Sequence, residues 1–124
     1  MIVISDTTFP LERVKKAWGE EIVLHNKEFC GKLLRFKSGG KFSFHYHVKK
    51  EEVWFINKGK FKLTYINTEN AERDEVFLKE GDIVLIERNT PHQLEAYEDG
   101  EIFEASTPHY DDDSYRIEKG DSQK

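Results

Sequence analysis

The stretch GGKFSFHYHVKKEEVWFINKG, from Gly39 to Gly59, decides the fold that the sequence predicts. On both sides of a short polar turn its residues follow the two-residue period of a β-strand, so the stretch reads as two strands joined in a hairpin. In the first strand one face carries Phe42, Phe44 and Tyr46, and the other carries Ser43, His45 and His47. We therefore expect a β-hairpin with two histidines side by side on one face.

The rest of the chain reads as further short β-prone segments separated by turns that contain Gly, Asn or Asp. No long helical pattern and no internal repeat is present. Such a series is typical of an all-β sandwich or barrel. The predicted strands are Glu21–His25, Phe29–Lys37, Phe42–His47, Glu52–Asn57, Lys60–Asn67, Glu75–Leu78, Ile83–Ile86, His92–Ala96 and Ile102–Ser106.

The two ends of the chain are less regular. Phe9–Trp18 reads either as one short helical turn or as an arm lying across the barrel. The tail from Glu118 onward is very polar, and we expect it to be frayed. We expect a single domain over residues 1–124, with a core at about 20–107, an N-terminal arm at 1–19 and a C-terminal rim and tail at 108–124.

Composition narrows the classes of function. A formal net charge of −5 argues against a nucleic-acid partner, which needs a basic face. Apolar runs are short and the first ten residues do not resemble a signal peptide, so we expect no membrane partner and a cytoplasmic location. Cys30 is the single cysteine, which excludes an internal disulfide, and we interpret it as a small buried hydrophobe. Lys49 and Lys50 read as a solvated pair in a turn.

The hairpin suggests a metal site. Imidazoles at positions i and i+2 of a strand, such as His45 and His47, project side by side and can hold one ion between them. Glu52 begins the next strand, and the hairpin returns it beside them. Glu51 is the rival by position, but strand parity places Glu52 on the inward face with Trp54 and leaves Glu51 in solvent.

A second segment, Gly81–Ala96, supplies a third imidazole. A buried strand at Ile83–Ile86 leads into a polar turn, and His92 opens the following strand. His92 shares its face with Leu94 and Ala96, and a histidine aimed into an apolar interior needs a partner. A shared metal ion would be one. His25 and His109 lack this support, and we expect both at the surface.

These two segments resemble the two conserved motifs of the cupin superfamily, over roughly the central two-thirds of the chain. The first motif, G-x5-H-x-H-x4-E-x6-G, is met in full by Gly39, His45, His47, Glu52 and Gly59. The second, G-x5-P-x-G-x2-H-x3-N, is met only by Gly81 and His92. At the other motif positions this sequence has Glu87 instead of Pro, Asn89 instead of Gly and Ala96 instead of Asn. Asn can still adopt the left-handed backbone that Gly would provide.

The resemblance implies the cupin fold, a double-stranded β-helix or jelly-roll-like barrel. It also implies one metal site with His45, His47, Glu52 and His92 as ligands. Three imidazoles and a carboxylate suit a divalent transition metal ion such as Mn, Fe, Co, Ni or Zn, and would leave positions open for a substrate.

Within the superfamily, several segments resemble the mannose-6-phosphate isomerase-like and lyxose isomerase-like proteins. They are Trp18-Gly19, Gly31–Leu34, the Glu52-x-Trp54 pair and the run Glu104–Arg116. This resemblance implies a sugar or sugar-phosphate isomerase or epimerase that works through a metal-chelated enediol. Glu104 is our candidate base and Lys32 the electrophilic helper, with a solvent-facing position as the alternative for at least one of them. Arg116 would hold a phosphate, or else form a salt bridge with Asp112 or Asp113.

Two other functions stay open. The same ligand set suits an iron-dependent dioxygenase, and a non-catalytic module that binds a sugar or small acid would use the same pocket. For any of them we expect a small molecule as partner. We also expect a homodimer joined sheet to sheet, because Phe42, Phe44, Val53 and Phe55 would otherwise face water.

Overall fold

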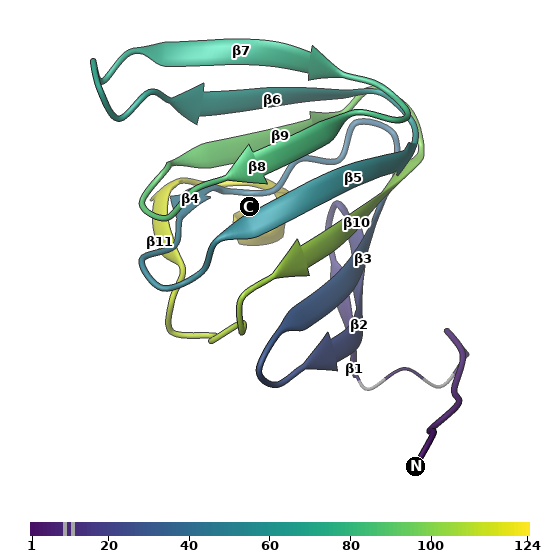
Figure 1. Ribbon diagram of the computed structural model, residues 1–124. Coiled ribbons are helices and arrows are strands. Elements are labelled where there is room, and N and C mark those ends of the chain that lie inside the picture. The colour runs from purple at the N-terminus through teal and green to yellow at the C-terminus, as the bar shows by residue number, and fades with distance from the viewer. Residues whose placement is uncertain (9, 11) are drawn as a thin grey trace.

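The computed structural model describes residues 1–8, 10 and 12–124, and it has the all-β architecture that the sequence predicts. Two antiparallel sheets face each other in a jelly-roll-like sandwich (Figure 1). One sheet has the strand order β1-β2-β3-β10-β5-β8, and the other has the order β11-β4-β9-β6-β7. Because neighbours in each sheet are often distant in sequence, residues from several segments meet between the sheets.

The strands are short, as expected for a small sandwich. Their bounds are β1 Glu12–Lys16, β2 Gly19–Asn26, β3 Cys30–Phe36, β4 Phe44–Tyr46, β5 Glu52–Lys58, β6 Phe61–Ile66, β7 Arg73–Leu78, β8 Ile83–Ile86, β9 His92–Ala96, β10 Gly100–Ser106 and β11 Tyr115–Glu118. A short 3-10 helix, η1, spans Asp121–Gln123. Each of the nine strands predicted from the sequence is present, and those at 83–86 and 92–96 have the predicted bounds.

The largest shortening of a predicted strand is at β4, which covers only three residues instead of the expected Phe42–His47. Phe42 and Ser43 precede the strand, so the alternation predicted across this segment is interrupted. Phe42 turns inward and packs edge-on against Trp18 and Trp54, at 6.2 Å between ring centroids in both cases. The expectation that Phe42 faces outward is therefore wrong.

Phe44 was also expected on an open outer face, and this too is wrong. Its side chain is fully buried, and the guanidinium of Arg73 lies 4.7 Å from its ring centroid. Val53 and Phe55, in contrast, are on the outer face of β5, with 38% and 42% of their surface exposed. Of the four side chains expected on an apolar outer surface, only these two, both on the six-stranded sheet, are exposed.

Aromatic rings build the core at one end of the sandwich. Trp18 stacks on Phe36 with centroids 4.4 Å apart, and Phe61 meets Phe36 edge to face at 5.3 Å. Aliphatic side chains from both sheets complete this cluster, among them Ile56 and Leu94, neither of which is accessible to water. The polar site described below lies beside this cluster, so the aromatic end supports it.

Both ends of the chain are more ordered than the sequence suggested. The segment after Pro10 contains neither a helical turn nor a crossing arm but strand β1, which pairs with β2; Phe9 and Leu11 lie outside the described residues. At the other end β11 pairs with β4. Gly120 is buried against Phe42, and Asp121 exchanges hydrogen bonds with Lys41. The tail predicted to be frayed therefore closes over the open side of β4.

Among the described residues, no helix has the length and apolar character needed to cross a membrane. Cys30 is 2% exposed, which confirms that it is a buried side chain, and burial raises the pKa of its thiol. Asn89 has φ of 64°, so it adopts the left-handed conformation expected of it in the turn before His92.

Candidate metal centre and its cavity

Three histidines meet between the two sheets. His45 lies in the middle of β4, His47 follows that strand, and His92 opens β9, where it is the register partner of His45. One ring nitrogen from each lies within 4.8 Å of the other two, an arrangement that could hold a metal ion. The hairpin and the second segment therefore bring together the three imidazoles that the sequence singled out.

The hydrogen bonds of these rings fix which nitrogen faces the centre. Nδ1 of His45 lies 2.8 Å from the carbonyl oxygen of Ser43, Nδ1 of His92 lies 2.8 Å from that of Thr90, and Nδ1 of His47 lies 2.7 Å from that of Asp113. A carbonyl oxygen can only accept, so each neutral ring carries its proton on Nδ1. Every Nε2 is left with a free lone pair, as a metal ligand requires.

Glu52, the first residue of β5, approaches the same point. Its Oε1 is 3.4 Å from Nε2 of His92, and its Oε2 is 4.0 Å from Nε2 of His47. Nε2 of His92 is buried and has no hydrogen-bond partner among the described residues. An unpaired buried nitrogen is costly, and a metal ion shared with a carboxylate would satisfy it. The donor set thus fits a divalent transition metal.

The protonation states of these side chains agree with a metal site. Burial, together with the neighbouring imidazoles, holds the pKa of His45 well below its usual value. Burial also lowers the pKa of His47, against the opposing effect of Glu52. Both rings are therefore neutral at pH 7. Burial alone would raise the pKa of Glu52, but Lys50 and His92 outweigh it and hold it well below the usual value, so this side chain is an anion.

Lys50 is the main residue of this site that the sequence analysis misplaced. It is 4% exposed rather than solvated, and its Nζ lies 3.0 Å from carboxylate oxygens of both Glu52 and Glu104. Burial alone would lower the pKa of Lys50, but the two carboxylates raise it above its usual value. Lys49, its predicted partner in solvent, is exposed and lies over the ring of Tyr110.

Glu104 and Lys32 face each other across paired strands β10 and β3, and both side chains point inward. Each is only 3% exposed, so neither takes the solvent-facing alternative. Burial and the negative charge of Glu52 raise the pKa of Glu104, although Lys50 and Lys32 oppose this. Lys32 has a second carboxylate nearby, that of Glu21 at 3.7 Å. A carboxyl with a raised pKa beside two ammonium groups is typical of acid–base sites.

His109 was expected at the surface, but the structure places it beside Lys50, with its Nδ1 3.5 Å from the lysine Nζ. Its Nε2 lies 3.2 Å from the exposed carboxylate of Asp111. Partial burial, together with the charges of Lys32 and Lys50, lowers the pKa of His109 to about 4. His109 is therefore a neutral side chain that lies between the buried charges and the solvent. His25 is half-buried and stacks on Phe29, apart from the site.

Asp113 holds the turn that carries these groups. Its carboxylate accepts hydrogen bonds from the backbone N–H groups of Val48, Lys49 and Lys50, at 3.0 to 3.2 Å. Its carbonyl also orients His47, as described above. Arg116 is exposed on β11 at the mouth of the site. The salt bridge considered for Arg116 with Asp112 or Asp113 is not among the ion pairs of the described residues.

The imidazole, carboxyl and ammonium groups of this site, except Asp113, line one cavity of about 370 Å³, large enough for a small polar molecule. It is lined by all seven site residues predicted from the sequence, His45, His47, Glu52, His92, Lys32, Glu104 and Arg116. Lys50 and His109 also line it. A second hollow of about 410 Å³ shares Lys32, Glu21 and His109 with it, so the two adjoin.

Neither of the two missed residues had a clear signal in the sequence. Lys50 lies in the turn before β5, where strand parity does not apply, and its position depends on Glu52 and Glu104. The position of His109 depends on the irregular segment after β10.

Comparison with known proteins agrees with the architecture. The family described as Cupin domain matches residues 32–105. No curated protein matches the chain in sequence at a significant level.

Many solved structures share the fold. Oxalate decarboxylase from Bacillus subtilis, a protein with Mn(II) centres, has a TM-score of 0.76 and 16% identity over 94% of this chain and 33% of its own. The capsular polysaccharide assembling protein CapF from Staphylococcus aureus has a TM-score of 0.75 and 18% identity, over 89% of this chain and 35% of its own. KdgF from Halomonas sp. has a TM-score of 0.62 and 19% identity, over 75% of this chain and 81% of its own. The chain thus spans about a third of the length of the first two.

Proposed function

The chain belongs to the cupin family, and on that premise we propose that it is a metal-dependent enzyme whose substrate is a sugar or sugar phosphate, which it isomerises or epimerises. The observation that carries the proposal is the buried carboxyl of Glu104, which lies in the same cavity as the three-histidine group and is joined to Glu52 through Lys50. A reaction that moves a proton between adjacent carbons needs such a group.

The proposed ligands of one divalent ion are His45, His47, His92 and Glu52. Their fit rests on the three free Nε2 lone pairs and on the unpaired buried Nε2 of His92. When bound, the ion supplies Lewis acidity toward the oxygens of a carbonyl and its neighbouring hydroxyl. A substrate held in this way would present its exchangeable C–H proton to the wall of the cavity that carries Glu104.

The remaining polar residues have distinct proposed roles. Glu104 removes a proton from one carbon and returns it to the next, and its raised pKa makes it a stronger base than an exposed glutamate. Lys50 fixes the positions of the carboxylates of Glu52 and Glu104, each of which has an oxygen 3.0 Å from its Nζ. Lys32 donates hydrogen bonds to a substrate oxygen that gains negative charge. Arg116, at the mouth, pairs with a phosphate if the substrate carries one.

A sugar-related substrate is consistent with the fold likeness to CapF, which is described as a capsular polysaccharide assembling protein. The Mn(II) centres of oxalate decarboxylase likewise support a transition metal as the cofactor. Both likenesses are below 20% identity, so the chemistry of the cavity remains the main support.

The test is an isomerisation assay. Protein loaded separately with Mn, Fe, Co, Ni or Zn is incubated with aldoses and ketoses, free and phosphorylated, in deuterated water. We expect interconversion with deuterium incorporated at the carbon beside the carbonyl. Glu104→Gln should lower kcat by at least about 100-fold, the usual contribution of a general base, and leave metal content unchanged. Glu95→Gln, on the same sheet as His92 but directed away from the cavity, is the matched control.

Absence of turnover with every metal and every sugar would overturn the proposal. Metal-dependent oxygen uptake with small thiols, diketones or phenols would assign the cavity to a dioxygenase. Saturable sugar binding without turnover would assign it to a binding module.

A further inference from the structure

Buried polar atoms without a hydrogen-bond partner are concentrated in the metal cavity. Within the described residues there are three such side-chain atoms, Nε2 of His92, Oε2 of Glu52 and Nε1 of Trp54, and all three residues line the cavity. Oε2 of Glu52 has the charge of Lys50 3.0 Å away, and the proposed ion would bind Nε2 of His92. The indole nitrogen of Trp54 is then the atom that still lacks a partner.

The indole nitrogen of Trp54 is a hydrogen-bond donor with no lone pair to offer, so it cannot be a ligand of the ion. Trp54 is 1% exposed, and a buried N–H without an acceptor is unfavourable. An oxygen atom would satisfy this N–H, and within the described residues none does so. The acceptor therefore has to come from a molecule that enters the cavity.

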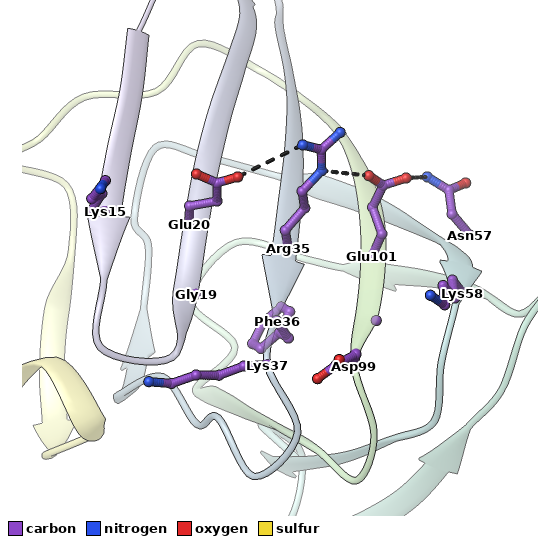
Figure 2. A pocket seen from close by; sticks show the side chains of 11 residues that line it. Lys15, Gly19, Glu20, Arg35, Phe36, Lys37, Asn57, Lys58, Asp99 and Glu101 are labelled. Carbon is purple, nitrogen blue, oxygen red and sulfur yellow. Dashed lines mark hydrogen bonds and ion pairs between the residues drawn. The ribbon is translucent and has the colours of Figure 1, made fainter. Parts of the chain in front are cut away.

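The polar groups of another hollow, in contrast, are paired with one another. This hollow of about 590 Å³ lies over β2, β3 and β10 at the outer face of the six-stranded sheet (Figure 2). Arg35 lies 2.9 Å from Glu101 and 3.7 Å from Glu20. Asn57 donates a hydrogen bond to Glu101 at 3.1 Å. A ligand there would have to displace these contacts, so the unpaired donor of Trp54 is a stronger indication of binding than this larger hollow.

Trp54 lies in a row of buried side chains that crosses three strands. It is the register partner of Glu104 on β10, which in turn is the register partner of Lys32 on β3. Side chains at paired positions of antiparallel strands are neighbours on one face, with Cβ atoms about 5 Å apart. Nζ of Lys32 is 3.7 Å from Glu21, beyond hydrogen-bond distance. Two donors, the ammonium of Lys32 and the unpaired N–H of Trp54, therefore flank the carboxyl of Glu104.

Neighbouring rings hold the indole of Trp54 in place. The ring of His92 meets it edge to face at 5.6 Å between centroids, and the ring of Phe42 does so at 6.2 Å. The indole is thus fixed between the proposed ion site and the aromatic end of the core. A donor that cannot turn away discriminates between molecules with and without an acceptor at that point.

We infer that Nε1 of Trp54 donates a hydrogen bond to a hydroxyl oxygen of the substrate, and thereby selects a polyhydroxylated molecule over the analogue that lacks this hydroxyl. The inference rests on the proposed function, because it takes the substrate to be a sugar. The acceptor is uncharged, since two carboxylates disfavour an anionic oxygen: Glu52, two residues earlier on the same face of β5, and Glu104 on the neighbouring strand. Trp54 is then a specificity-determining residue.

This hydrogen bond would also orient the substrate. A sugar whose carbonyl and neighbouring hydroxyl lie at the ion site would be held at a second point by Trp54. Two points of attachment fix which carbon faces Glu104. Loss of the hydroxyl at the second point leaves the indole N–H buried and unpaired, which disfavours binding of the deoxy analogue.

The indole N–H signal of Trp54 provides a test that does not depend on turnover. The chain has two tryptophans, so protein with ¹⁵N-labelled indole groups gives two signals in a nuclear magnetic resonance spectrum. The signal absent from Trp54→Phe belongs to Trp54, and Trp18→Phe gives the same assignment if Trp54→Phe does not fold. Zinc-loaded wild type, which is diamagnetic, is titrated with D-glucose, D-mannose, D-fructose, D-lyxose and D-xylulose, each free and phosphorylated. With a sugar that binds, we expect the Trp54 proton signal to move downfield and its exchange with solvent to slow by at least about tenfold.

Analogues of the bound sugar that lack one hydroxyl each show whether this hydrogen bond selects the substrate. By isothermal titration calorimetry, one of them should bind the wild type at least about tenfold more weakly than the parent sugar does. Trp54→Phe keeps an aromatic ring but has no N–H, so it should bind the parent sugar and that analogue with equal affinity. Tyr97→Phe, which removes a hydroxyl group from an exposed ring outside the cavity, should keep the wild-type preference.

The outcomes separate this inference from the proposed reaction. A sugar that binds or is converted without changing the Trp54 signal would overturn the inference alone. A changed Trp54 signal without conversion would support the inference and overturn the proposed reaction, and absence of binding by every sugar would overturn both. A Trp54 N–H that exchanges slowly in the sugar-free protein, and that no sugar affects, would have a partner inside the protein and would likewise overturn the inference.

Discussion

Opposite faces of the six-stranded sheet carry two groups of acidic and basic side chains that differ in their surroundings. On the inner face Lys50 pairs with Glu52 and Glu104, and these side chains are 3% to 4% exposed. On the outer face Arg35 pairs with Glu101, at 40% and 27% exposure. Both groups involve β5 or β10, and the distances between opposite charges are about equal, 3.0 Å and 2.9 Å.

The distance between two opposite charges therefore does not indicate how much their ion pair contributes to stability or to function. Water screens the outer pair, so forming or breaking it within one chain changes stability little. The inner charges have lost their water, so each depends on the others and on the cavity around them. Such a buried group is unfavourable for a fold without a use for it, which favours a functional role for the inner cluster.

The largest expected effect is from removing the buried ammonium. Lys50→Met leaves the carboxylates of Glu52 and Glu104 buried without their shared counter-charge, which should lower the free energy of unfolding by about 3 kcal/mol. Urea unfolding of metal-free protein measures this. Lys49→Met, at the exposed neighbouring position, should change it by less than about 0.5 kcal/mol. Adding Glu104→Gln to Lys50→Met should recover part of the lost free energy of unfolding. If Lys50→Met lowers the free energy of unfolding no more than Lys49→Met does, the buried carboxylates do not depend on the charge of Lys50.

The next effect is a pH dependence from His109. Its pKa is about 4 in the folded protein and about 6.5 when unfolded, so the unfolded chain binds more protons between these values. Stability therefore rises with pH across this window and falls as the pH is lowered from about 6.5 to about 4. The pKa values of His45 and His47 are also lowered. The contribution of His109 alone is therefore the difference between the pH profiles of the wild type and of His109→Gln.

We expect the wild type to lose about 1 kcal/mol more than His109→Gln between pH 7 and pH 4.5, because water partly screens the side chain. Thermal unfolding of metal-free protein across this range provides the measurement. Parallel pH profiles for the two proteins would mean that His109 titrates normally and is not held beside Lys50.

The smallest effect is expected on the outer face. Arg35→Ala should reduce the free energy of unfolding by only about 0.2–1 kcal/mol, because water screens its ion pair with Glu101. The loss should diminish further in 1 M salt, since exposed pairs are screened. A loss near that of Lys50→Met would remove the distinction between the two faces.

The sequence predicted the parts of the fold in which alternation and turns are local signals. The strands, the inward direction of Glu52 and Trp54, and the meeting of His45, His47 and His92 follow from period-two patterns and motif spacing. The resemblance to cupins added the expected convergence of distant segments, which periodicity alone cannot supply.

The parts that it missed depend on tertiary contacts. β1 and β11 are charged strands, and they form because neighbouring strands offer them an edge. Phe42 turns inward because β4 starts two residues later than the alternation suggests. Lys50 is buried because Glu104, distant in sequence, supplies a second carboxylate. These contacts join residues that are distant in sequence, so a short window of sequence does not predict them.

The most direct test of the metal centre is its metal content. Purified protein is loaded with each of Mn, Fe, Co, Ni and Zn, desalted and examined by elemental analysis beside His92→Ala and the control His25→Ala. We predict about one ion per chain in the wild type and the control, and less than about a tenth of that in His92→Ala. A wild type that retains no metal, or a His92→Ala variant that retains as much as the wild type, would contradict the account.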